Sequence, residues 1–93
     1  TVLADGMACR IADRAALDVL IPHIDHIVQV SDIEVAAAMR ALYVDTHNVA
    51  EGAGAASFAA AMQERAQLTG LVVGTTLCGG NVDADMFAKV LTG

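Results

Sequence analysis

"LVVGTTLCGGNVD", residues 71–83, carries the strongest indication of fold class in this chain. Residues 68–77 are apolar without alternation, which is typical of a strand buried on both faces of a parallel sheet. Two glycines and Asn81 follow the thiol of Cys78, and two aspartates then stand where a helix N-terminus favours negative charge. We therefore expect a strand, a tight turn with Asn81 as the N-cap, and a helix over residues 82–91.

A capping box gives the clearest local signal elsewhere. In "SDIE", residues 31–34, the hydroxyl of Ser31 can accept from the amide of Glu34, whose carboxylate can reach back to the amide of Ser31. The helix that starts here should run to about Thr46. Weaker patterns predict a helix from Asp13 that stops before Pro22, a strand at residues 26–30, and an alanine-rich helix over residues 55–66.

This order of elements predicts an α/β fold with two or three strands and flanking helices. A sheet of two strands is not stable by itself. We therefore expect residues 1–93 to be part of a larger domain, with the sheet completed by further sequence or by another copy of the chain. The first residue, Thr1, fits such a piece.

Composition supports the same expectation. The chain is 56% hydrophobic and 17% charged, which is more apolar and less charged than an ordinary domain. A net charge of −6 with five basic residues disfavours nucleic-acid binding. No apolar run is long enough to span a membrane, and no signal peptide is visible. Two cysteines are too few for a disulfide scaffold, so a cytoplasmic compartment is expected.

The local candidates for chemistry each have a plain alternative. Cys78 stands at the carboxyl end of the expected strand, where ligands of open α/β sheets bind, but a tight turn with Asn81 as the N-cap and a buried, inert thiol is the simpler explanation of the glycines. Glu51, before the glycines of "EGAGAA", could face a site or favour the helix dipole. His23 and His26 lack a third ligand, so they are expected to be exposed loop residues and no metal site is predicted.

Four motifs in order resemble the C-terminal part of pyridoxal-phosphate-dependent threonine/serine dehydratases. This tryptophan-synthase-β-like family includes serine racemases and hydroxyaspartate ammonia-lyases. The motifs are "LADGMA" (3–8), "VSDIEVAAAMR" (30–40), "EGAGAA" (51–56) and "LCGGNVD" (77–83). The resemblance covers the whole chain. It implies part of a fold-type-II domain and a parent enzyme that deaminates 3-hydroxy amino acids to 2-oxo acids and ammonia.

The resemblance also implies site residues. Cys78 would face the pyridine nitrogen of pyridoxal 5'-phosphate, and as a weak donor it would keep the ring a modest electron sink. Gly79 and Gly80 would let the backbone approach the ring, and Asn81 would fix the turn. Glu51 and Gly52 would line the cofactor cavity.

The family's Schiff-base lysine motif, its phosphate loop and its metal ligands have no counterpart here, and Lys89 does not match that lysine. We therefore expect no catalytic residue in this segment, and activity only together with an N-terminal part. The expected partners are an amino-acid substrate and a homo-oligomer or that N-terminal part, with no nucleic acid or membrane. Three alternatives stay open: an oligomerising structural fragment, a racemase or hydroxyaspartate ammonia-lyase relative, and an independent small-ligand binder.

Overall fold

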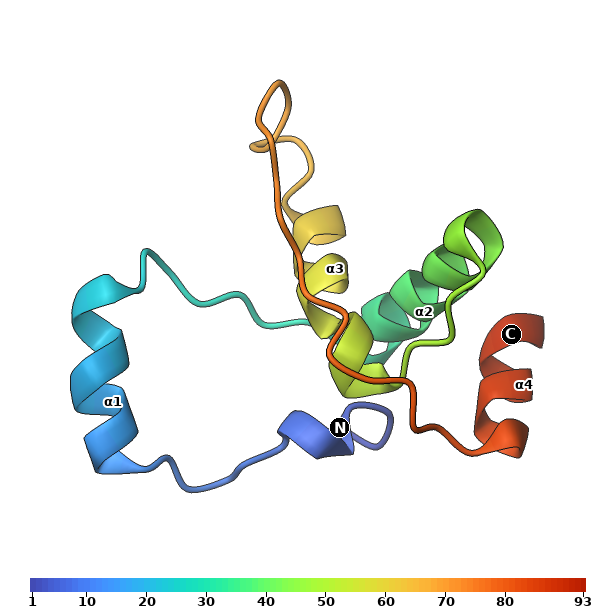
Figure 1. Ribbon diagram of the computed structural model, residues 1–93, viewed down its shortest axis with the longest axis horizontal. Helices are drawn as coiled ribbons and strands as arrows, with labels where there is room; N and C mark the ends of the chain where they lie inside the picture. The colour runs from blue at the N-terminus through green and yellow to red at the C-terminus, as the bar shows by residue number, and fades with distance from the viewer.

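A computed structural model describes all 93 residues, and it contains helices, turns and extended segments but no β-strand. Figure 1 shows a flat arrangement, 40 × 35 × 18 Å, in which α2 and α3 pack together at the centre. The helices α4 and α1 lie on either side, and α1 stands apart from the rest. In chain order the elements are the 3₁₀ turn η1 (Asp5–Met7), α1 (Arg14–Leu20), the 3₁₀ turn η2 (Ile21–His23), α2 (Asp32–Thr46), α3 (Gly52–Gln63) and α4 (Ala84–Thr92).

The predicted α/β fold, with its two or three strands, is wrong. Residues 26–30 are extended but unpaired, while residues 68–77 form a turn as far as Gly70 and then an unpaired extended segment. A β-ladder needs a neighbouring strand whose amides and carbonyls complete it. No backbone hydrogen bond joins the two segments. Each is held instead by a side chain of α3: Gln63 donates to the carbonyl of Gln29 at 2.9 Å, and Ser57 to that of Thr76 at 2.7 Å.

The core lies between α2 and α3 and is small. Met39 and Val35 are its largest fully buried side chains, and most of the other members are alanines, which let the helix axes approach closely. Only 11 of 93 residues are buried, so most of the apolar residues are exposed or only partly buried. The core consists of Val35, Ala38, Met39, Ala50, Ala55, Ala56, Ala59 and Val90.

The local signals for helix ends are largely confirmed. Ser31 and Glu34 form the capping box, and α2 ends at Thr46 as expected. Asp13 caps α1 by accepting from two amides, and the helix stops before Pro22. His47 ends α2 in the left-handed conformation, with φ of 57°, where its amide bonds the carbonyl of Tyr43.

Two other helices have boundaries that differ from the predictions. The N-cap of α4 is Asp83, without a side-chain capping bond, and not Asn81. The helix α3 begins at Gly52 and ends at Gln63, three residues earlier at each end than the expected 55–66. Gly52 and Gly54 belong to this helix, where they pack against neighbouring backbone. No helix is both long and apolar enough to cross a bilayer.

Candidate functional site

Three of the sequence motifs meet at the N-terminus of α3. The amide of Glu51 donates to the carbonyl oxygen of Gly79 at 3.0 Å, which joins "EGAGAA" to "LCGGN". Gly52 lies against the carbonyl of Leu3, which joins the same turn to "LADG". Segments separated by about 25 to 50 positions in the chain are therefore held at one corner, as the red-orange segment passing the base of α3 shows in Figure 1.

Glycines make this corner possible. A Cβ on Gly54 would overlap the carbonyl oxygen of Gly79, and one on Gly52 would overlap the carbonyl of Leu3. A Cβ on Gly80 would lie 2.5 Å from the carbonyl oxygen of Val49. Backbone cannot yield as a flexible side chain can, so only glycine fits at these three positions. The space left by the absent side chains of these glycines is therefore filled by backbone of other segments of the same chain.

The carboxylate of Glu51 is part of the same corner. Glu51 is half-buried at the N-cap of α3, and its side chain makes no capping hydrogen bond to the helix amides. A Cβ on Gly79 would lie 2.6 Å from its Oε1, so the carboxylate lies against the bare Cα of that glycine. Glu51 therefore contacts the Cys78–Asn81 corner through both its backbone and its side chain.

A cavity of about 280 Å³ lies beside this contact. Three of the six predicted cofactor-binding residues line it, namely Glu51, Gly52 and Asn81. Its other polar walls include Asp5 and Asp83, and no lysine or arginine lines it. The cavity is thus acidic and disfavours an anionic ligand group.

The other three predicted residues, Cys78, Gly79 and Gly80, are not part of the cavity wall. Cys78 is exposed with a free thiol, and Gly79 and Gly80 are occupied by the backbone and carboxylate contacts described above. A groove of about 910 Å³ lies between α2 and α4, and none of the six residues lines it. No group of three or more metal-binding side chains gathers anywhere in the chain.

Asp32 fixes the N-terminal motif to the first turn of α2. Its carboxylate accepts from the hydroxyl of Thr1 and, at 2.9 Å, from the amide of Val2. These hydrogen bonds, that of Thr1 first, lower the pKa of Asp32. Asp32 also accepts from the amide of Leu3, and the carbonyl of Leu3 lies against Gly52. These contacts connect α2 to the start of α3.

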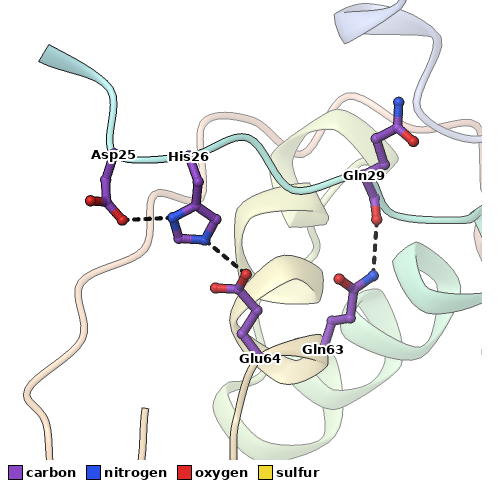
Figure 2. A network of polar contacts seen from close by, with 5 residues as sticks. All are labelled: Asp25, His26, Gln29, Gln63 and Glu64. Carbon is purple, nitrogen blue, oxygen red and sulfur yellow. Dashed lines mark hydrogen bonds and ion pairs between the residues drawn. The ribbon is translucent and has the colours of Figure 1, made fainter. Parts of the chain in front are cut away.

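Sequence reasoning missed one polar network, which Figure 2 shows. His26 is exposed, as predicted, yet its two ring nitrogens lie 2.8 Å from carboxylate oxygens of Asp25 and Glu64. The hydrogen bond to Asp25, followed by that to Glu64, raises the pKa of His26. Because Glu64 is 38 positions away in the chain, no local pattern could have indicated this pair.

Comparison with known proteins decides the family. The family model described as "Pyridoxal-phosphate dependent enzyme" matches residues 1–79. The chain belongs to this family. The resemblance drawn from the motifs is confirmed, and pyridoxal phosphate is the cofactor of the family's complete enzymes.

Individual relatives are ammonia-lyases and dehydratases. L-threonine ammonia-lyase of Thermotoga maritima is 32% identical over 89 residues, which are 96% of this chain and 22% of the relative. Phenylserine dehydratase of Ralstonia pickettii is 36% identical over 96% of the chain and 28% of its own length. L-threo-3-hydroxyaspartate ammonia-lyase of Saccharomyces cerevisiae is 31% identical over 98% of the chain and 28% of its length. The chain thus spans about a quarter of the length of these relatives.

The donor groups of this corner are chemically compatible with one end of the family's cofactor. A free, exposed thiol at Cys78 is a weak donor that suits a neutral pyridine nitrogen. The acidic cavity beside the contact between Glu51 and Gly79 does not suit the phosphate, which needs amides or cations. Within this family the residues present are therefore compatible with the ring-nitrogen end of the cofactor and not with its phosphate end.

Proposed function

We propose that this chain forms the pyridine-nitrogen side of the cofactor site in an ammonia-lyase that deaminates 3-hydroxy amino acids such as threonine or serine. The observation that carries the proposal is the hydrogen bond between the amide of Glu51 and the carbonyl of Gly79, which brings the two site motifs together. The names of the three relatives support the reaction class, since each is an ammonia-lyase or a dehydratase.

In this proposal pyridoxal phosphate supplies the electron sink for breaking bonds at the amino-acid Cα. The chain's own residues tune and position it. Cys78 offers a thiol proton at the ring nitrogen, and a thiol, as a weak donor, does not stabilise a pyridinium as a carboxylate does. Glu51 holds Gly79, and so sets where the thiol stands. A modest electron sink favours prompt loss of the β-hydroxyl over prolonged charge at Cα.

The chain alone is proposed to be inactive. Its single lysine, Lys89, lies in the last turn of α4 and matches no lysine motif of the family. The covalent anchor, the phosphate cradle and the proton-transfer groups are proposed to come from polypeptide outside these 93 residues. Threonine, serine, phenylserine and hydroxyaspartate are the candidate substrates, and the upstream residues would choose among them.

A chimaera tests this proposal. The chain replaces the matching 89-residue segment of the Thermotoga maritima enzyme, and cofactor absorbance and ammonia release from L-threonine are measured. We expect the chimaera to bind the cofactor and release ammonia, whereas the isolated chain does neither. A chimaera that folds as the relative does but binds no cofactor contradicts the proposal.

Exposed apolar side chains support association as a second candidate role. Ile11, Ile33 and Val72 are 91%, 80% and 104% exposed, and α1 is covered by no other helix. Surfaces of this kind are typical of chains that pack against another polypeptide. Sedimentation of the isolated chain tests the idea, because a stable monomer at all concentrations contradicts self-association.

A further inference from the structure

The segment of residues 25–30 is fastened to the rest of the molecule at few points. It makes no backbone-to-backbone hydrogen bond. Val30 at its end packs on the core, whereas Ile27 is 79% exposed. Apart from the bond between Gln63 and Gln29, its polar link to α3 is the pair His26–Glu64 (Figure 2). The pair His26–Glu64 changes its charge with pH, whereas the hydrogen bond between the Gln63 side chain and the Gln29 carbonyl contains no group that titrates.

The geometry of His26 requires a particular protonation state. Ring nitrogens Nδ1 and Nε2 are each 2.8 Å from a carboxylate oxygen, of Asp25 and of Glu64 respectively. An ionised carboxylate only accepts hydrogen bonds, and a neutral imidazole carries a single N–H. Both contacts are therefore satisfied at once only by the imidazolium.

The surroundings favour the same cation. Glu64 is the C-cap of α3, where the helix dipole attracts positive charge. Glu34 of α2 is engaged by Gln63, at 2.9 Å, and adds negative charge on this side. The neighbouring cation, Arg65, turns its guanidinium to the carbonyl of Met62.

We infer that His26 is a pH-dependent latch, which holds residues 25–30 against the C-terminal end of α3 when its imidazole carries both protons. Deprotonation removes one of the two N–H donors, so either Asp25 or Glu64 loses its hydrogen bond. Asp25 is adjacent in sequence, and its contact does not join separate segments. The Glu64 contact weakens in either tautomer, because it loses the N–H when the proton stays on Nδ1 and loses its ion-pair attraction when the proton stays on Nε2. Gln63 is then the remaining polar tether that does not titrate.

The sign of the pH dependence follows from the raised pKa of His26. The latch is at full strength below the ordinary histidine pKa of about 6.5, and it weakens as the pH rises through the raised value. The latch acts at the far end of α3 from the Glu51 corner and involves no cofactor. Its failure would therefore leave the proposed function untouched.

An NMR titration of the isotope-labelled chain tests the latch. The imidazole of His26 and the methyl groups of Ile27 and Val28 are followed from about pH 5 to about pH 9, on both sides of the ordinary histidine pKa. We expect His26 to titrate above its ordinary value and the Ile27 methyl to move with the same midpoint. Methyl chemical shifts that do not change as His26 titrates would overturn the inference.

Variants separate the latch from a general pH effect. Glu64→Gln is expected to lower the midpoint of His26 and to abolish the response of the Ile27 methyl. The side chain of Asp25 is 98% exposed, and Asp25→Asn is expected to lower the midpoint but to keep the methyl response. His23→Gln is the matched control and should change neither. An unchanged midpoint in both carboxylate variants overturns the inference, even if one of them folds poorly.

Discussion

The amide of Glu51 and the carbonyl of Gly79 form a 3.0 Å hydrogen bond that joins the start of α3 to the corner following Cys78. Gly54 lies against the same carbonyl group, so the helix and the corner touch backbone to backbone. This contact is the basis for treating "EGAGAA" and "LCGGN" as one site. Its consequences can be tested in the chain itself and in the chimaera.

Gly54→Ala should break this contact. The added methyl group overlaps the carbonyl of Gly79, so the corner must move or α3 must shift. We expect a loss of about 1–3 kcal/mol in the free energy of unfolding, as for other overpacked positions. Urea denaturation measures it. Gly74→Ala is the control, because nothing lies within 4 Å of the position of its added Cβ, and it should be close to neutral.

Ser31→Ala should destabilise α2 by removing one half of the capping box. The hydroxyl accepts from the amide of Glu34 at 3.3 Å, and loss of such an N-cap typically costs about 1 kcal/mol. Helical circular dichroism during denaturation reports the change. Ser57→Ala is a comparison within α3, since its hydroxyl bonds the carbonyl of Thr76 and caps no helix. Equal loss of helix stability in both variants would contradict the capping role.

Glu34 should make the stability of α2 fall in acid. Its pKa is lowered, first by the hydrogen bond from the Ser31 amide and then by that from Gln63. A lowered pKa in the folded state means stability that is present above the ordinary value of 4.5 and lost as the pH falls through the lowered one. Glu34→Gln should flatten this part of the profile of stability against pH. A profile identical to that of the unsubstituted chain would exclude Glu34 as its source.

Asp32→Asn should release the N-terminal motif. The carboxylate accepts from Thr1 and Val2, and its lowered pKa makes this tether weaken below the ordinary value of 3.8. We expect faster amide hydrogen exchange at Val2 and Leu3 in the variant, with α2 itself little changed. Unchanged exchange at these amides would show that Asp32 does not hold the segment.

Local signals in the sequence predicted the ends of α1 and α2 well and the fold class poorly. The capping box at Ser31, the cap at Asp13 and the stop before Pro22 depend on neighbours within four residues, so the sequence contains their cause. The formation of a strand does not depend on near neighbours alone, because the apolar run around Val72 becomes a strand only if another strand pairs with it. The chain offers no such partner, and Val72 is fully exposed.

The candidate site was likewise predicted only in part. The motifs indicated Glu51, Gly52 and Asn81, and the structure places these three around one cavity. The reason for the glycines was not visible in the sequence, because Gly79 and Gly80 face Glu51 and Val49 across long stretches of chain. The pair His26–Glu64 was missed for the same reason.

Cys78→Ala in the chimaera should reduce ammonia release without abolishing cofactor binding. The thiol is proposed to give one weak hydrogen bond to the ring nitrogen, and such a bond is worth about 1 kcal/mol, or about fivefold in rate. Cys9→Ala is the matched control, since it removes the other exposed thiol, which lies outside the site. Equal activity of the two variants would exclude a role for Cys78 in the reaction.

The most direct test of the central claim is the ¹⁵N chemical shift of the cofactor's pyridine nitrogen in the chimaera, recorded with labelled pyridoxal phosphate. If Cys78 faces that nitrogen, Cys78→Ala will change the shift, while Cys9→Ala will leave it as in the unsubstituted chimaera. The same pyridine shift in both variants, with the cofactor bound in each, would contradict the assignment of this corner to the ring nitrogen.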